Sequence, residues 1–175
     1  MKPVFFDIDT QIDFMFPAGA LYVPGADRIV PVVAQLNQHA GVVVSTMCAH
    51  AENDPEFRDW PPHCVVGTTG QLKPQSTLRA SGQIILEKQR LDLYTNPNLP
   101  KLLEELAADE YVVYGVVTEY CVKYAALGLL KTGKPVTLVT DAIQSLRAED
   151  GEAVIQAFTA AGGRLATSSK LLPMR

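Results

Sequence analysis

The chain has 175 residues, of which 15 are Lys or Arg and 19 are Asp or Glu, and its formal net charge at pH 7 is −4. A chain of this length is expected to form one domain, residues 1–175, and its 47% hydrophobic and 19% charged residues are ordinary for a globular protein. The acidic balance excludes the basic surface of a nucleic-acid-binding protein, so we expect no nucleic-acid partner.

Short apolar runs alternate with stretches of helical periodicity along the chain, which is typical of βαβ units around a parallel sheet. We therefore predict a three-layer αβα fold of the α/β class, with a Rossmann-like, six-stranded, mostly parallel sheet. Strands are predicted at residues 4–8, 42–46, 84–86, 111–117, 136–140 and 165–166. Helices are predicted at residues 27–39, 99–108, 119–131 and 149–161. Residues 48–82 show little periodicity and predict a long irregular insertion, which in a compact domain is usually functional.

The N-terminal segment does not resemble a targeting sequence. Asp7, Asp9 and Asp13 fall where a signal peptide would need its apolar stretch. No apolar run approaches the roughly 18 residues that a membrane span needs. We therefore expect a cytoplasmic protein without a membrane partner.

Parallel α/β sheets bind ligands outside the carboxyl ends of their strands. The segment after the first strand lacks the GxGxxG pattern of dinucleotide-binding folds, and the chain contains neither GxxxxGK[ST] nor GxSxG. Nucleotide binding and serine hydrolysis are therefore disfavoured. Asp9, Lys88 and Cys121 instead follow the first, third and fourth predicted strands, which places all three at the same edge of the sheet.

Cys121 has the clearest argument for chemical reactivity. The preceding strand ends at Val117, Thr118 is a suitable N-cap, and a thiol in the first helical turn lies near unpaired backbone N–H groups that lower its pKa. A neighbouring lysine acts in the same direction, and a carboxylate can accept the thiol proton and return it to a leaving group. Each residue also has an ordinary interpretation. Cys121 is then a small core side chain, Asp9 a turn acid and Lys88 a strand-end charge.

The three cysteines, Cys48, Cys64 and Cys121, are widely spaced along the chain. Their odd number and spacing predict neither a disulfide framework nor a CxxC pair. The count is compatible with a catalytic thiol.

Three segments together resemble the nicotinamidase and isochorismatase-like cysteine hydrolases. DTQIDF, residues 9–14, is similar to the opening motif of this family, which has an Asp, any residue, a Gln, then an Asp two residues on and a Phe. Residues 84–88 resemble the strand that carries the family lysine, and GVVTEYCVKYAALGLL, residues 115–130, resembles the nucleophile segment. The three segments occur in the family's order, and the similarity covers nearly the whole chain.

The resemblance implies hydrolysis of an amide through a thioester and no organic cofactor. Cys121 would attack the carboxamide carbon, Asp9 would carry the proton to departing ammonia, and Lys88 would favour the thiolate and position Asp9. Family members usually have a cis peptide bond before the cysteine, which here would join Val116 and Val117. The backbone N–H groups of Val117 and Cys121 would then form the oxyanion hole.

The stretch WPPHCVVGTTG, residues 60–70, resembles one that nicotinamidases carry between their second and third strands. The resemblance implies that Phe14 and Trp60 form aromatic walls around a pyridine ring. An anchor for the irregular loop is an equally good interpretation of Trp60.

The family also binds a divalent metal through an Asp-x-His motif and one or two later histidines. Here Cys48 stands at the Asp position, His50 and His63 match histidines, and Glu56 falls near the place of another histidine in some members. Two imidazoles, a thiolate and a carboxylate suit zinc, so one divalent metal, zinc, is expected. The alternative is that the metal site is lost and the histidines only form hydrogen bonds in the pocket.

These features predict a nicotinamidase-like amidohydrolase that converts nicotinamide to nicotinate and ammonia. Its expected partners are a small amide substrate and other copies of the chain in a homo-oligomer. One alternative is hydrolysis of another small amide, ureido or carbamoyl compound, which Cys48 favours and the WPPHC stretch disfavours. A second alternative is a non-catalytic small-molecule binding protein, which would have no need of Asp9, Lys88 and Cys121 together.

Overall fold

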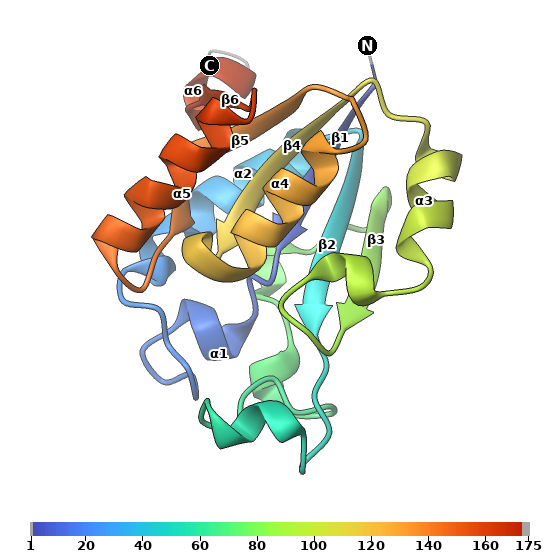
Figure 1. Ribbon diagram of the computed structural model, residues 1–175. Helices are drawn as coiled ribbons and strands as arrows, with labels where there is room; N and C mark the ends of the chain where they lie inside the picture. The colour runs from blue at the N-terminus through green and yellow to red at the C-terminus, as the bar shows by residue number, and fades with distance from the viewer. Residues whose placement is uncertain (1, 173–175) are drawn as a thin grey trace.

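A computed structural model describes residues 2–172, which are built around a six-stranded sheet (Figure 1). The strands lie in the order β3-β2-β1-β4-β5-β6, and every pairing between neighbours is parallel. The sheet is therefore wholly parallel, where the sequence predicted a mostly parallel one. The strands are β1 Pro3–Ile8, β2 Val42–Cys48, β3 Gln83–Lys88, β4 Glu110–Val116, β5 Val136–Gln144 and β6 Arg164–Ala166.

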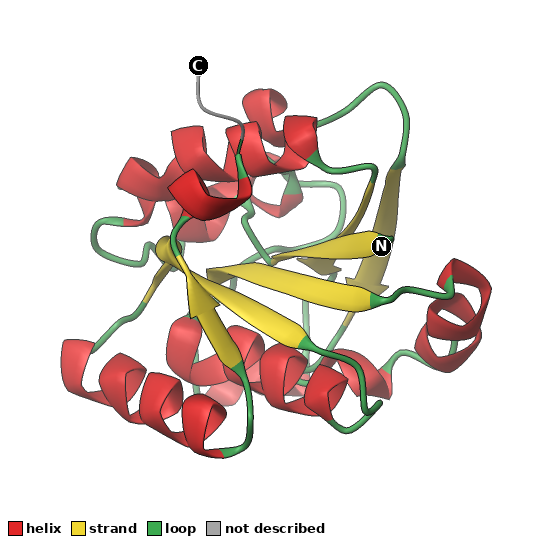
Figure 2. Ribbon diagram, turned by 90° about the horizontal axis from the view of Figure 1, so that it is seen from above, coloured by secondary structure: helices red, strands yellow, loops and turns green. Residues whose placement is uncertain are grey.

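Helices cover both faces of the sheet, which confirms the three-layer α/β architecture (Figure 2). α2 and α6 pack together on one face, whereas α4 and α5 pack together on the other. Within residues 2–172, no helix has the length and apolar character needed to cross a membrane. The helices are α1 Ile12–Met15, α2 Val30–His39, α3 Leu99–Leu106, α4 Lys123–Leu130, α5 Ala148–Ala160 and α6 Ser168–Leu171.

The central strands β1 and β4 are almost entirely buried, as expected for parallel strands covered by helices on both faces. The rings of Phe6 and Tyr111 meet edge to face across this pair, with centroids 5.6 Å apart. Gly115 has a φ of 118°, and a Cβ atom there would collide with the backbone of Ile8. Glycine therefore allows β4 to approach β1 closely where both strands reach the carboxyl edge of the sheet.

The segment after β4 begins differently from the helix predicted at residues 119–131. Residues Thr118–Val122 form a single π-helical turn, and α4 continues from it to Leu130. The buried hydroxyl of Thr118 has no hydrogen-bond partner among the described residues, so Thr118 is not the predicted side-chain cap. π turns within helices occur frequently at functional sites.

The predicted irregular insertion extends from the end of β2 to the start of β3. Its first part lies beyond the carboxyl end of the sheet (Figure 1), and its last part returns along α2 to the start of β3. A parallel bridge joins His50 to Val65 within the insertion. The unpredicted helix α1 packs beside it, and the Ile12 N–H donates to the carbonyl of Leu72 at 2.8 Å. One helical turn is too short to produce a recognisable period in the sequence. The insertion also contains three short 3₁₀ turns, Pro55–Arg58, Thr69–Gln71 and Gln75–Thr77.

Candidate active site

The carboxyl ends of β1, β3 and β4 bring the three predicted catalytic side chains together. Asp9 follows β1, Cys121 lies in the π turn after β4, and Lys88 is the last residue of β3 rather than the residue just beyond it. Their exposed fractions are 0% for Asp9, 4% for Lys88 and 5% for Cys121. β1 and β4 flank the point at which the winding of the sheet reverses, where open α/β sheets bind their ligands.

Lys88 is the centre of this cluster. Its Nζ lies 2.7 Å from Asp9 Oδ2, 3.3 Å from the sulfur of Cys48 and 3.6 Å from the sulfur of Cys121, and it donates to the carbonyl of Arg90 at 3.0 Å. Burial lowers the pKa of the Lys88 ammonium, but the charges of Asp9 and the two sulfurs outweigh burial and raise the pKa well above its ordinary value. Lys88 is therefore a permanent buried cation at the site.

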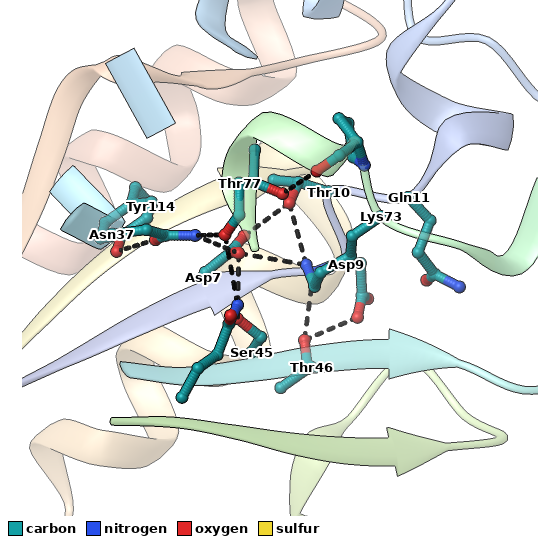
Figure 3. Close-up of polar contacts among 12 residues, drawn as sticks. Asp7, Asp9, Thr10, Gln11, Asn37, Ser45, Thr46, Lys73, Thr77 and Tyr114 are labelled. Atoms are coloured by element: carbon teal, nitrogen blue, oxygen red, sulfur yellow. Dashed lines mark hydrogen bonds and ion pairs between the residues drawn. The ribbon is translucent and has the colours of Figure 1, made fainter. Parts of the chain in front are cut away.

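Two hydrogen bonds with the Thr46 hydroxyl hold Asp9 in place. The Thr46 hydroxyl donates to Asp9 Oδ1 at 2.6 Å and accepts the Asp9 backbone N–H at 3.1 Å (Figure 3). Burial raises the pKa of the Asp9 carboxyl, but the charge of Lys88 and hydrogen bonds from Cys121, Lys88 and Thr46 hold it below its ordinary value. An ionised carboxylate beside a thiol is placed to accept the thiol proton.

Cys48, at the end of β2, adds a second thiol to the cluster. Its sulfur lies 3.7 Å from Asp9 Oδ2. The interaction with Cys121 lowers the pKa of Cys48 to about 6, and the same interaction, together with burial, raises the pKa of Cys121 well above its ordinary value. Cys121 therefore depends on Asp9 to take up its thiol proton. Sequence spacing gave no sign of this thiol pair.

A small pocket opens above the two thiols. The predicted aromatic walls Phe14 and Trp60 both line it, and the Trp60 ring lies edge-on to Tyr120, with centroids 5.5 Å apart. Tyr120 and Leu146 were not predicted as pocket residues. The pocket lining includes no Lys or Arg. It consists of Phe14, Leu21, Val23, Cys48, Glu56, Trp60, His63, Leu91, Val117, Tyr120, Cys121 and Leu146.

The backbone around the predicted oxyanion hole has the expected conformation. The peptide bond between Val116 and Val117 is cis, as the family resemblance implied. Val117 and Cys121, whose N–H groups were predicted to bind the oxyanion, both line the pocket. Their assignment as an oxyanion hole stays a prediction.

Three of the four predicted metal ligands form a group beside the pocket. One ligand atom each from His50, Glu56 and His63 lies within 4.8 Å of the others. Nδ1 of His50 contacts Asp54 Oδ2 at 3.0 Å and Nδ1 of His63 contacts the carbonyl of Pro61 at 2.8 Å, which orients each Nε2 as in metal-bound histidines. Within the described residues His50 Nε2 is buried without a hydrogen-bond partner, which a metal ion would satisfy.

The fourth predicted ligand, Cys48, does not belong to this group. Its sulfur contacts Lys88 and Asp9, because β2 ends beside the catalytic cluster. The candidate metal site is thus reduced to two imidazoles and one carboxylate. Such a set suits zinc with one coordination position left for a substrate or water.

Two further residues of the first motif hold the insertion against the sheet. The Gln11 side chain accepts the Cys48 N–H at 2.7 Å and donates to the carbonyls of Cys48 and Gln71, both at 2.8 Å. Asp13 accepts the N–H of Cys64 at 2.7 Å. Sequence reasoning identified the motif but assigned a role only to its first and last residues. The structure shows that Gln11 and Asp13 position the loops that carry the pocket.

A second buried ion pair lies close to the site but outside the pocket (Figure 3). Lys73, from the insertion, places its Nζ 3.2 Å from Asp7 Oδ2 and 2.9 Å from the Thr10 hydroxyl. Asn37 and Ser45 each donate to the same carboxylate at 3.0 Å. This pair is fully buried, and its acceptors are satisfied by groups of the fold itself.

Comparison with known proteins places these features in a family context. The model of the isochorismatase domain matches residues 3–170. The nicotinamidase of Acinetobacter baylyi is 27% identical over 79% of both chains, and that of Escherichia coli is 27% identical over 91% of this chain and 92% of the relative. Among solved structures, the pyrazinamidase of Pyrococcus horikoshii in complex with zinc is 30% identical, with a TM-score of 0.87 over 95% of this chain and 99% of the other.

Proposed function

The chain belongs to the isochorismatase family, and from this membership we propose that it is a nicotinamidase, a cysteine-dependent amidohydrolase that converts nicotinamide to nicotinate and ammonia. The observation that carries the proposal is the position of Cys121 in the lining of an apolar pocket with aromatic walls, in contact with the Lys88–Asp9 pair beneath it. A planar, uncharged aromatic amide matches the chemistry of this lining.

Cys121 is the nucleophile, although Cys48 lies beside it. The backbone N–H of Cys48 is occupied by the Gln11 side chain at 2.7 Å and cannot bind an oxyanion. Cys121 lies in the first turn of its helix, where backbone N–H groups near the sulfur are available to a tetrahedral intermediate. Attack from Cys121 therefore places the developing oxyanion next to Val117 and Cys121.

The reaction follows from the positions of these groups. The sulfur of Cys121 attacks the carboxamide carbon, and Asp9 receives the thiol proton and delivers it to the departing ammonia. Lys88 keeps Asp9 ionised before attack and stabilises the thiolate. A water molecule, deprotonated by Asp9, then cleaves the thioester, and the acid product leaves.

His50, Glu56 and His63 would hold one divalent metal, with zinc as the best match to their donor set. A bound zinc would supply a Lewis acid for the ring nitrogen of the substrate. Metal content of the purified protein, compared with that of His50→Ala, tests this assignment. A fully active wild-type protein free of metal would contradict it.

Amides that carry an acid group are the alternative substrates. The pocket lining includes Glu56 but no Lys or Arg that could bind the acid group of such a substrate. Lys88, below the floor, is already paired with Asp9. A substrate carboxylate would therefore find no lysine or arginine partner in the pocket, and the proposed metal would be the ligand of the ring nitrogen of nicotinamide. This lining favours a neutral amide over ureido acids and other anionic substrates.

Ammonia release from nicotinamide by the purified protein tests the function. We expect release by the wild type, none by Cys121→Ala, and release at a comparable rate by Cys64→Ser, whose thiol lies outside the pocket. Turnover of an anionic amide but not of nicotinamide would replace the proposed substrate. The absence of turnover with both kinds of amide would favour the binding-protein alternative.

A further inference from the structure

Cys48 and Cys121 come from distant parts of the chain and meet at the floor of the pocket. Lys88 Nζ lies 3.3 Å from the Cys48 sulfur and 3.6 Å from the Cys121 sulfur, so one ammonium group contacts both. Amide hydrolysis requires only one attacking sulfur. The second buried thiol therefore has no part in the proposed reaction.

We propose that Cys48 and Cys121 form a modification site at which a hydroperoxide reversibly inactivates the enzyme, with Cys48 as the resolving cysteine. The inference rests on the proposed function only in that Cys121 is the activated nucleophile. A thiolate that is accessible and adjacent to a second thiol is the usual setting of a redox-sensitive cysteine.

The chemistry takes place in two steps. Asp9 takes the Cys121 thiol proton as the sulfur attacks one oxygen of a hydroperoxide. An S–O bond forms, the O–O bond breaks, and the departing alkoxide or hydroxide takes up this proton; sulfur is oxidised by two electrons and the peroxide is reduced. The sulfur of Cys48 then attacks the sulfur of the resulting sulfenic acid. The S–S bond forms, the S–O bond breaks, and hydroxide leaves with the Cys48 proton as water.

The surroundings of the two cysteines favour attack of the Cys48 sulfur on the sulfenic acid at Cys121. Both cysteines line the substrate pocket, so a small peroxide reaches them by the route that the amide uses. Cys48 ends β2 and Cys121 lies in a single π turn, so both sulfurs belong to the ends of elements rather than to their centres. Capture by Cys48 would compete with oxidation of Cys121 to the irreversible sulfinic acid.

Cys64 provides a matched control within the same chain. It is fully buried, does not line the pocket, and its sulfur is 4.0 Å from the carbonyl of Gly70. A peroxide that enters the pocket therefore does not meet the Cys64 thiol.

Treatment of the wild-type protein with hydrogen peroxide, followed by peptide mass spectrometry under non-reducing conditions, tests the site. We expect a cross-linked peptide pair containing Cys48 and Cys121, a mass lower by two hydrogen atoms, and loss of activity that dithiothreitol restores. The same result is expected for Cys64→Ser. In Cys48→Ala, measured against its own untreated activity, the loss should become irreversible and Cys121 should carry two added oxygen atoms.

Peroxide-treated wild type with sulfinic acid at Cys121 and no cross-link would overturn the inference, as would equal recovery of wild type and Cys48→Ala after dithiothreitol. The cross-link is read by mass on the wild-type chain, so the result does not depend on whether Cys48→Ala folds. It also does not depend on nicotinamide being the substrate. Failure of the proposed function would appear as absent ammonia release from nicotinamide, whereas failure of the modification site would appear as an absent cross-link.

Discussion

Asp7 and Asp9 are two residues apart at the end of β1, and each carboxylate is paired with a fully buried lysine. Asp7 meets Lys73 from the insertion at 3.2 Å, whereas Asp9 meets Lys88 from β3 at 2.7 Å. The Asp7 pair is surrounded by hydroxyl and amide donors of the fold (Figure 3). The Asp9 pair instead adjoins two thiols below a pocket.

The difference shows that a buried ion pair does not by itself identify an active site. The Asp7 pair joins β1 to the insertion and leaves no group free for a ligand. At the Asp9 pair, Lys88 donates to sulfur atoms that line a pocket, so the pair can act on a bound molecule. The neighbours of the pair determine whether it stabilises the fold or performs chemistry.

Asparagine substitutions at the two aspartates should give the largest contrast. Asp9→Asn removes the group that carries the proton, and we expect turnover to fall by up to about 10⁴-fold. Asp7→Asn should leave turnover per folded molecule within a few-fold of wild type, since the partners of Asp7 are Lys73 and hydrogen-bond donors of the fold rather than the thiols. Steady-state kinetics on the folded fraction of each variant measure this difference. Equal losses in the two variants would remove the distinction between the pairs.

Methionine substitutions at the two lysines should affect stability alike and activity differently. Lys73→Met and Lys88→Met each leave a buried carboxylate without its cation, which lowers the free energy of unfolding by about 3–5 kcal/mol. Only Lys88→Met should also abolish turnover. Urea unfolding combined with kinetics checks both parts. Activity lost to the same degree in Lys73→Met would show that the Asp7 pair takes part in catalysis.

The Asp9 pair should also make stability sensitive to acid. The pKa of Asp9 is lowered in the folded state from an ordinary value near 3.8. The contribution of the ionised Asp9 to the free energy of unfolding is therefore complete above pH 3.8, and it is lost as the pH falls through the folded-state pKa. The contribution is about 1.4 kcal/mol for each unit between the two pKa values. Urea midpoints measured at decreasing pH should fall less steeply below pH 4 for Asp9→Asn than for wild type. Parallel curves would contradict the assignment of this acid sensitivity to Asp9.

The smallest expected effect concerns the outer part of the Asp7 network. The Tyr114 hydroxyl donates to Asn37 Oδ1 at 2.6 Å, and Asn37 in turn donates to Asp7. Tyr114→Phe should lower the free energy of unfolding by about 1–2 kcal/mol, because a buried acceptor loses its donor. KM and kcat should not change. A shift in KM would connect this network to the substrate pocket.

Much of the catalytic site could be predicted from local patterns. Apolar runs marked the strands, and in a parallel sheet the residues that follow strands share one edge, so Asp9, Lys88 and Cys121 were expected to meet. Phe14 and Trp60 were expected in the pocket from their motifs, and both line it. The predicted roles of these residues in the reaction are what the proposed experiments test.

Other features had no local signal. The π turn at Thr118–Val122 replaces the predicted cap because its conformation depends on packing against β4 and α5. Lys73 lies in an irregular loop, and its pairing with Asp7 depends on the path of that loop across the sheet edge. Cys48, which was predicted as a metal ligand, lies outside the group that the predicted ligands His50, Glu56 and His63 form, and no sequence pattern indicated this.

The sequence by itself determined the α/β class, the order of strands and helices, and the candidate catalytic residues, because each depends on periodicity or on position at a strand end. Only the tertiary structure decided the environment of each side chain. It placed Cys48 beside Lys88 and Asp9 and outside the group of three candidate metal ligands, and it paired Asp7 with Lys73, away from the thiols that adjoin the Asp9 pair. These outcomes depend on contacts between segments far apart in the chain, which no local pattern encodes.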